Sequence, residues 1–222
     1  QGRTSLQTAV AMIPYQLAVL AAAVLVVRLY GQLTPRQIAR SAFAVVTVGT
    51  LMLAVIVRYE WSDVSVVLGL MLVGLGQGAL ATLLFNVLVT SAPTEFAGDV
   101  GALRGTVSNL AGAVGTAVAG ALVIGILSAN IQRALIDNPT IPSALISKVD
   151  LDNVRFVSND RLLDMMSRTT ATSEQMDAAL EINADARVRA LKVTFLLLTC
   201  LGLLAFVPAG RLPDYKPDEV PG

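Results

Sequence analysis

The amino-acid sequence predicts an all-α membrane protein, and the placement of its charged residues carries this prediction. The chain is 55% hydrophobic and only 14% charged, which is too apolar for an ordinary soluble domain. Five stretches contain no Asp, Glu, Lys or Arg: Thr8–Val27, Ser41–Val57, Val64–Ala92, Gly105–Gln132 and Val193–Gly210. A core helix of a soluble protein keeps one polar face, so stretches of this length without any charge are expected to cross a bilayer.

Residues that the chain lacks exclude several classes of function. There is no histidine, which excludes histidine general bases, Ser-His-Asp or Cys-His nucleophile systems and histidine metal sites. Cys200, the single cysteine, is expected to be a small buried hydrophobe. The 16 basic residues balance the 16 acidic ones without forming a basic run, so we expect no nucleic acid partner. We predict no enzymatic activity, no cofactor and no metal site.

The charged connections indicate the domain organisation and the orientation. Four transmembrane helices are predicted within residues 1–132, at about 8–27, 41–57, 64–92 and 105–132, and a fifth at 193–210. The loop 28–40 contains three arginines and no acid, so the positive-inside rule places it in the cytoplasm. Alternation of the helices then places 133–192 outside and the tail 211–222 in the cytoplasm, which predicts a multi-pass protein of the cell membrane with a cytoplasmic C-terminus.

The long outer loop holds half of the charged residues. Thr172 and Gln175 have the spacing of a capping box, which predicts the start of a helix. Apolar residues then recur at helical spacing from Met176 to Leu191. We expect a folded helical extension that runs without a break into the last span, with a solvated linker as the alternative.

Two predicted spans are rich in small residues at four-residue spacing. Such residues let helix backbones approach closely in a membrane, where no hydrophobic drive acts between helices. We therefore expect the third and fourth helices to be central in a bundle. Their packing positions would be Gly74, Gly78, Gly112, Gly115 and Gly120.

Uncharged polar side chains also occur in the spans, where they mark interhelical hydrogen bonds or the wall of a cavity. They include Gln16, Gln77, Thr82, Asn86 and Asn109. Thr82 and Asn86 are four residues apart and share a face with Gly78. No span contains a carboxylate, so a buried acid for proton coupling cannot belong to these five helices.

Three segments between Gly69 and Ser128 occur in one order: Gly-Leu-Gly-Gln-Gly at 74–78, Ser-Ala-Pro-Thr-Glu-Phe-Ala-Gly-Asp-Val-Gly-Ala-Leu-Arg at 91–104, and Asn-Leu-Ala-Gly-Ala-Val-Gly-Thr-Ala at 109–117. Together they resemble the 14-helix drug:proton antiporter branch of the major facilitator superfamily. Arg28-Leu29 with Pro35-Arg36 also resembles the basic inner loop of that superfamily, although Gly31 and Thr34 replace its usual Asp and Gly.

The resemblance implies that the chain is the C-terminal half-bundle of a secondary active transporter, about five of fourteen helices. Such a protein would export drugs or other small organic compounds in exchange for protons by alternating access, with the coupling carboxylates in a missing N-terminal half. The chain starts with Gln1, which also leads us to expect a piece of a longer protein.

On this hypothesis the polar residues of the spans take defined roles. Gln77, Thr82 and Asn86 would line the substrate pathway, with Gln16 and Asn109 behind them. The cytoplasmic gate would consist of Arg28, Arg36 and Arg104, paired with Glu95 and Asp99. Two alternatives remain: a non-transporting scaffold or partner-binding protein that acts through the outer loop, and a proton symporter that imports a nutrient.

Overall fold

The computed structural model describes residues 4–57, 64–90, 93–137, 159–168, 171–212 and 214. These residues form α1 (Ser5–Leu29), α2 (Pro35–Ile56), α3 (Val64–Thr90), the 3-10 turn η1 (Thr94–Phe96), α4 (Ala97–Asp137), α6 (Asn159–Ser167), α7 (Ser173–Leu204) and α8 (Phe206–Ala209). Among them no strand forms, and α1, α2, α3, α4 and α7 are long and apolar enough to cross a membrane. The prediction of an all-α fold with five helices long and apolar enough to span a membrane is confirmed for the described residues.

Capping boxes define where three of the helices begin. Thr4, Thr34 and Thr172 each accept a hydrogen bond from the backbone three residues on, where a glutamine side chain accepts one in return. Each box satisfies two of the backbone N–H groups that a helix N-terminus leaves unpaired. The predicted helix start at Thr172 is confirmed, and α7 then continues to Leu204 as one helix.

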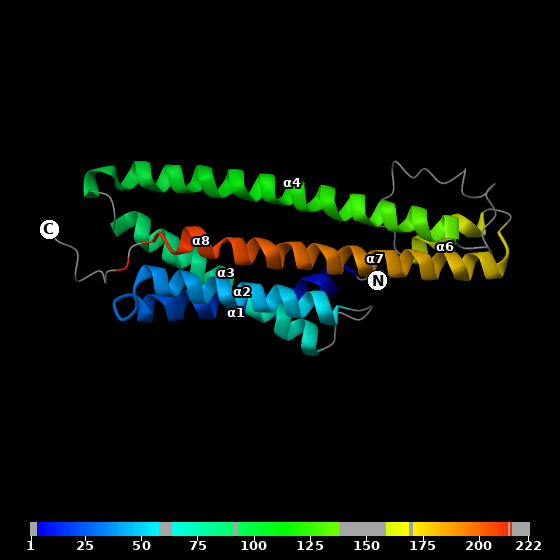
Figure 1. Ribbon diagram of the computed structural model, residues 1–222, viewed down its shortest axis with the longest axis horizontal. Coiled ribbons are helices and arrows are strands. Elements are labelled where there is room, and N and C mark those ends of the chain that lie inside the picture. Colours follow the sequence, from blue (N-terminus) through cyan, green and yellow to red (C-terminus); the bar gives the residue numbers. More distant parts are fainter. Residues whose placement is uncertain are drawn as a thin grey trace.

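Helix α3 packs against both α1 and α2, and glycines make these contacts possible (Figure 1). A Cβ at Gly74 would lie 2.6 Å from the carbonyl oxygen of Tyr15 in α1, and one at Gly76 would lie 2.7 Å from that of Ala42 in α2. A Cβ at Gly78, one turn after Gly74, would also collide with the backbone of α1. The backbone of α3 is therefore in direct contact with its neighbours on two sides.

Helix α7 joins this three-helix unit to α4. Its second half packs on α2, where Phe195 contacts the buried cluster of Leu53, Val57 and Val66. Its first half packs on the end of α4 through Leu127, Ala186 and Ala190, which are at most 3% exposed.

The position of α4 differs from our expectation. Only 6% of its apolar stretch is buried, and a Cβ at Gly112, Gly115 or Gly120 would meet nothing within 4 Å among the described residues. The larger side chains Val123 and Ile126, which pack on α7, lie beyond these glycines. Because α4 packs mainly on α7 through its C-terminal part and has only minor contact with α3, α3 and not α4 is the central helix of this chain.

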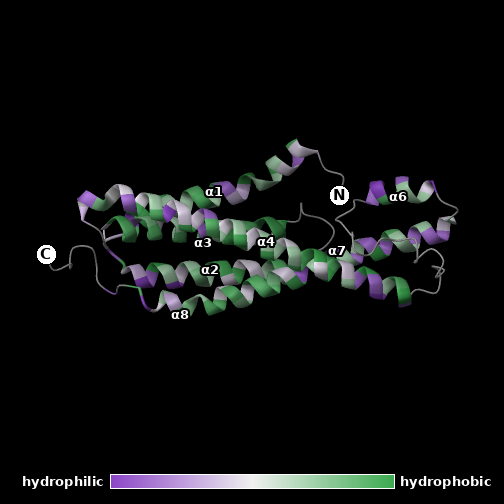
Figure 2. Ribbon diagram, turned by 90° about the horizontal axis from the view of Figure 1, so that it is seen from above, coloured by the Kyte–Doolittle hydropathy of each residue, from purple (hydrophilic) through white to green (hydrophobic). Residues whose placement is uncertain are grey.

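Helices α4 and α7 also extend far beyond the three-helix unit (Figure 1). The 41 residues of α4 correspond to about 60 Å of helix, roughly twice the hydrocarbon thickness of a bilayer. We call the projecting part, residues 127–137, 159–167 and 173–190, the distal extension. Figure 2 shows that hydrophilic residues gather in α6 and in the first part of α7, as a segment outside the membrane requires.

Cys200 lies on the outer surface of α7 and not in the core. The expectation of a buried thiol is therefore wrong for this chain. The apolar stretch around it indicated lipid contact as well as burial, because a span is apolar on every face.

We predict that Gly78→Ala destabilises the fold by about 1–3 kcal/mol, because the added methyl group collides with the α1 backbone. Thermal unfolding of the purified protein in detergent would measure this loss. Gly112→Ala is the matched control, since its methyl group meets no described atom within 4 Å and helix propensity should raise stability by about 0.5–1 kcal/mol. Equal effects of both substitutions would contradict the proposed packing of α3.

Candidate functional site

A polar group lies midway along the two adjacent helices α1 and α3. Gln16 is in the middle of α1 (Ser5–Leu29) and Gln77 in the middle of α3 (Val64–Thr90). The Tyr15 hydroxyl donates a hydrogen bond to the Gln77 side-chain oxygen and so joins the two helices. Both glutamines are exposed, and Tyr15 is half-buried. We call Tyr15, Gln16 and Gln77 the mid-span polar group.

Pro14 adds a second unusual feature next to this group. It lies inside α1, where a proline removes one backbone hydrogen bond and bends the helix. Figure 2 shows that the first part of α1 diverges from α3. The mid-span polar group therefore lies where α1 changes direction. Sequence reasoning missed Tyr15, although a hydroxyl between Pro14 and Gln16 within a charge-free span was a usable signal.

Thr82 and Asn86 do not share the face of Gln77. They follow it by five and nine residues, which is about 140° and 180° around a helix axis. Both are half-buried, whereas Gln77 is exposed. The structure therefore does not place the three residues on one wall. Asn109 lies on the exposed part of α4, and in the described residues no hydrogen bond joins its side chain to any of them.

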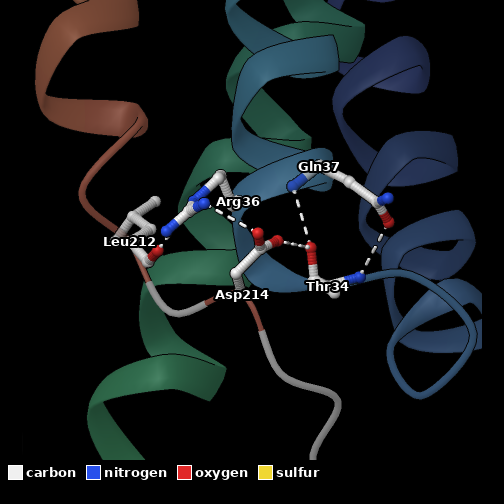
Figure 3. A network of polar contacts seen from close by, with 5 residues as sticks. All are labelled: Thr34, Arg36, Gln37, Leu212 and Asp214. Carbon is white, nitrogen blue, oxygen red and sulfur yellow. Dashed lines mark hydrogen bonds and ion pairs between the residues drawn. The ribbon is translucent and has the colours of Figure 1, made fainter.

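We call one end of the bundle the basic end: α1, α3 and α7 end there, and α2 and α4 begin there. The contacts at this end differ from those predicted for the cytoplasmic gate. Arg36 forms an ion pair of 2.7 Å with Asp214 in the C-terminal tail (Figure 3). Arg104 lies over the Phe85 ring, 4.9 Å from its centroid. Among the described residues no ion pair involves Arg28.

Glu95 and Asp99 likewise form no ion pair in the described part of the chain. They lie before and in the first turn of α4, which contacts α3 and α7. The acids are therefore not brought to the loop between α1 and α2, and the tail supplies the partner of Arg36. In the first turn of α4, Asp99 is placed favourably with respect to the helix dipole.

A buried pair of hydroxyl groups connects α2 with α7. Thr199 donates a hydrogen bond of 3.0 Å to Thr50, whose own hydroxyl donates to the Val46 carbonyl oxygen at 3.0 Å. One turn away, a Cβ at Gly202 would lie 2.5 Å from the Thr47 hydroxyl oxygen. Small residues thus allow close contact here too. Sequence reasoning missed this pair because no local pattern links positions 149 residues apart.

The distal extension contains a cavity of about 330 Å³ between α4 and α7. It is lined by Asn130, Ala134, Asp137, Ala178, Glu181, Ile182, Asp185, Ala186 and Arg189. Beside it, Asn159 of α6 accepts hydrogen bonds from Asn183 at 2.9 Å and from Arg187 at 3.4 Å, which dock α6 on α7. This cavity is distant in the fold from the mid-span polar group (Figure 1).

Comparison of the chain with protein-family models, with curated proteins and with solved structures gave no match. The functional argument therefore rests on the sequence and on the contacts described above.

We predict a coupling energy of about 0.6 kcal/mol between Thr50 and Thr199, the size typical of hydrogen bonds between membrane helices. A double-mutant cycle with Thr50→Val and Thr199→Val, measured by unfolding in detergent, would determine it. Thr106→Val is the control, because its hydroxyl bonds only within α4. Additive effects of the two valine substitutions would show that the pair does not stabilise the contact of α2 with α7.

Proposed function

We propose that the chain is the C-terminal half-bundle of a secondary active transporter of the major facilitator type, which exports drugs or other small organic compounds in exchange for protons. The resemblance of Gly69–Ser128 to the drug:proton antiporter branch supports the family. Five apolar helices with a glycine-rich central helix are consistent with it. Because the five charge-free stretches within these helices contain no carboxylate, the proposal places the coupling acid in the other half of the transporter.

The observation that carries the proposal is the exposure of the mid-span polar group. Amide side chains facing hydrocarbon are costly, and polar residues inside a membrane usually face a bundle interior or a water-filled cavity. Gln16 and Gln77 nevertheless face away from the remainder of the chain, midway along their helices. A second half-bundle closing over α1 and α3 would convert this surface into a central cavity.

Two features of the half-bundle support alternating access as the mechanism in this proposal. Secondary transporters hold substrate near the bilayer midplane and rock one bundle against the other around that site. In this proposal the mid-span polar group, midway along α1 and α3, would lie at this depth, where its amide and hydroxyl groups can form hydrogen bonds with an organic substrate. The broken backbone hydrogen bond at Pro14 gives α1 a hinge beside the site.

The distal extension favours a second candidate function, in which the chain binds a partner outside the membrane. Its cavity and docked α6 form a folded surface distinct from the spans. Removal of α6, residues 159–167, would abolish partner binding under this second function and leave substrate transport intact under the first.

The transporter proposal predicts proton-driven movement of an organic substrate. The full-length gene product, reconstituted in vesicles, would be given a proton gradient and a panel of organic cations and neutral drugs. We expect at least one compound to accumulate against its own gradient. If no compound moves against its gradient under any condition, the proposal is wrong.

Gln77→Ala tests the site itself. We expect a roughly 10-fold lower transport rate at unchanged membrane abundance, the equivalent of about 1.4 kcal/mol from one lost polar interaction. Gln32→Ala makes the same change in the loop between α1 and α2 and serves as the matched control. A loss of transport with Gln32→Ala as large as with Gln77→Ala would exclude a specific role for the mid-span polar group.

A further inference from the structure

Leu212 and Asp214 of the C-terminal tail lie against the start of α2 and are held there by three polar contacts (Figure 3). The Arg36 Nε atom donates to the Leu212 carbonyl oxygen at 3.1 Å, and its Nη1 atom donates to one Asp214 oxygen at 2.7 Å. The second Asp214 oxygen accepts a hydrogen bond of 3.0 Å from the Thr34 hydroxyl. Both carboxylate oxygens of Asp214 are therefore engaged by residues about 180 positions earlier in the chain.

The residues that hold the tail also begin α2. The Thr34 hydroxyl accepts a hydrogen bond from the Gln37 backbone in the capping box while it donates to Asp214. The Asp214 carboxylate thus lies beside a helix N-terminus, where negative charge is favoured by the helix dipole. Charge, hydrogen bonding and the dipole all act in the same direction at this contact.

An apolar contact anchors the same segment. Leu212 packs against the cluster formed by Val26, Ile38, Ala39, Leu83 and Ala209. Leu212, shortly after α8 ends, therefore joins a core cluster whose members come from α1, α2, α3 and α8. At the basic end, α8 and these tail residues add to the direct packing of α7 on α2.

The polar part of the contact is weak enough to open. The side chains of Arg36 and Asp214 are 33% and 51% exposed, and an exposed ion pair of this kind shifts an equilibrium by at most about fivefold. Salt at moderate concentration screens such a pair. The polar contact thus has a defined geometry, but little free energy is needed to break it.

We propose that Arg211, Leu212 and Asp214 form a releasable strap that holds the end of α7 against the start of α2. Opening the strap removes one of the contacts at the basic end of α7, while Gly202 beside Thr47 and the Thr50–Thr199 pair keep the two helices together deeper in the bundle. The device does not depend on transport, because it concerns the chain's own helices.

Limited trypsin digestion of the full chain in nanodiscs tests the strap directly. Trypsin cleaves after Arg211, which is exposed, but needs the next residues extended in its active site, and Leu212 is held by Arg36 while the strap is closed. Release of residues 212–222, quantified by mass spectrometry, therefore reports the open fraction. We expect Asp214→Asn to accelerate this release about fivefold.

Three comparisons decide the outcome. Asp99→Asn makes the same change at the same end of the bundle, where no ion pair is present among the described residues, and should leave cleavage unchanged. Arg36→Gln combined with Asp214→Asn should accelerate cleavage no more than Arg36→Gln alone, because Arg36→Gln already removes the ion pair with Asp214 together with the hydrogen bond to Leu212. Salt at 0.5 M, about the range where the Debye length falls below 5 Å, should accelerate cleavage of the unaltered chain but not of Asp214→Asn.

The proposal is overturned if Asp214→Asn is cleaved at the unaltered rate, or if the effects of the two substitutions multiply. The salt dependence of the unaltered chain tests the strap without any substitution, so the test remains valid even if a variant folds poorly. A cleavage rate of the unaltered chain that is independent of salt would likewise exclude a strap held by charge.

Discussion

The contact of the α3 backbone with α1 and α2 is the constraint on which the rest of this structure depends. Between helices in a bilayer no hydrophobic drive acts, so association relies on close packing and hydrogen bonds. Gly74 and Gly78 provide the approach to α1, and Gly76 provides it to α2. The same geometry brings the Tyr15 hydroxyl to Gln77, because the two backbones lie close enough for side chains of ordinary length to meet at mid-span.

Helix α7 extends this arrangement in two directions. Toward the basic end it packs on α2, with small residues and the Thr50–Thr199 hydrogen bond at the contact. In the distal extension, α7 packs on α4 through the apolar residues Ala186 and Ala190. There Asn183 of α7 also forms a hydrogen bond with α6. Most of the apolar stretch of α4 is left exposed. In the proposed transporter this surface would pack against the other half-bundle.

The sequence predicts the fold class because absence of charge over a whole span is a local property, and it predicts the capping box at Thr172 for the same reason. Placement of α4 was not predictable, since small residues permit close packing but do not specify the partner. The pairing of Arg36 with Asp214 was missed because it joins distant segments. The separation of Gln77 from Thr82 could have been predicted from helical periodicity alone.

Helix α7 runs without interruption from Ser173 to Leu204. Thr199, which is bonded to α2, is about 39 Å from Ser173 at 1.5 Å per residue. If α7 tilted as a rigid rod by about 5° around Thr199, Ser173 would move by roughly 3 Å, by the same helix geometry. A displacement of the distal extension would then reach the contact with α2 along one continuous helix.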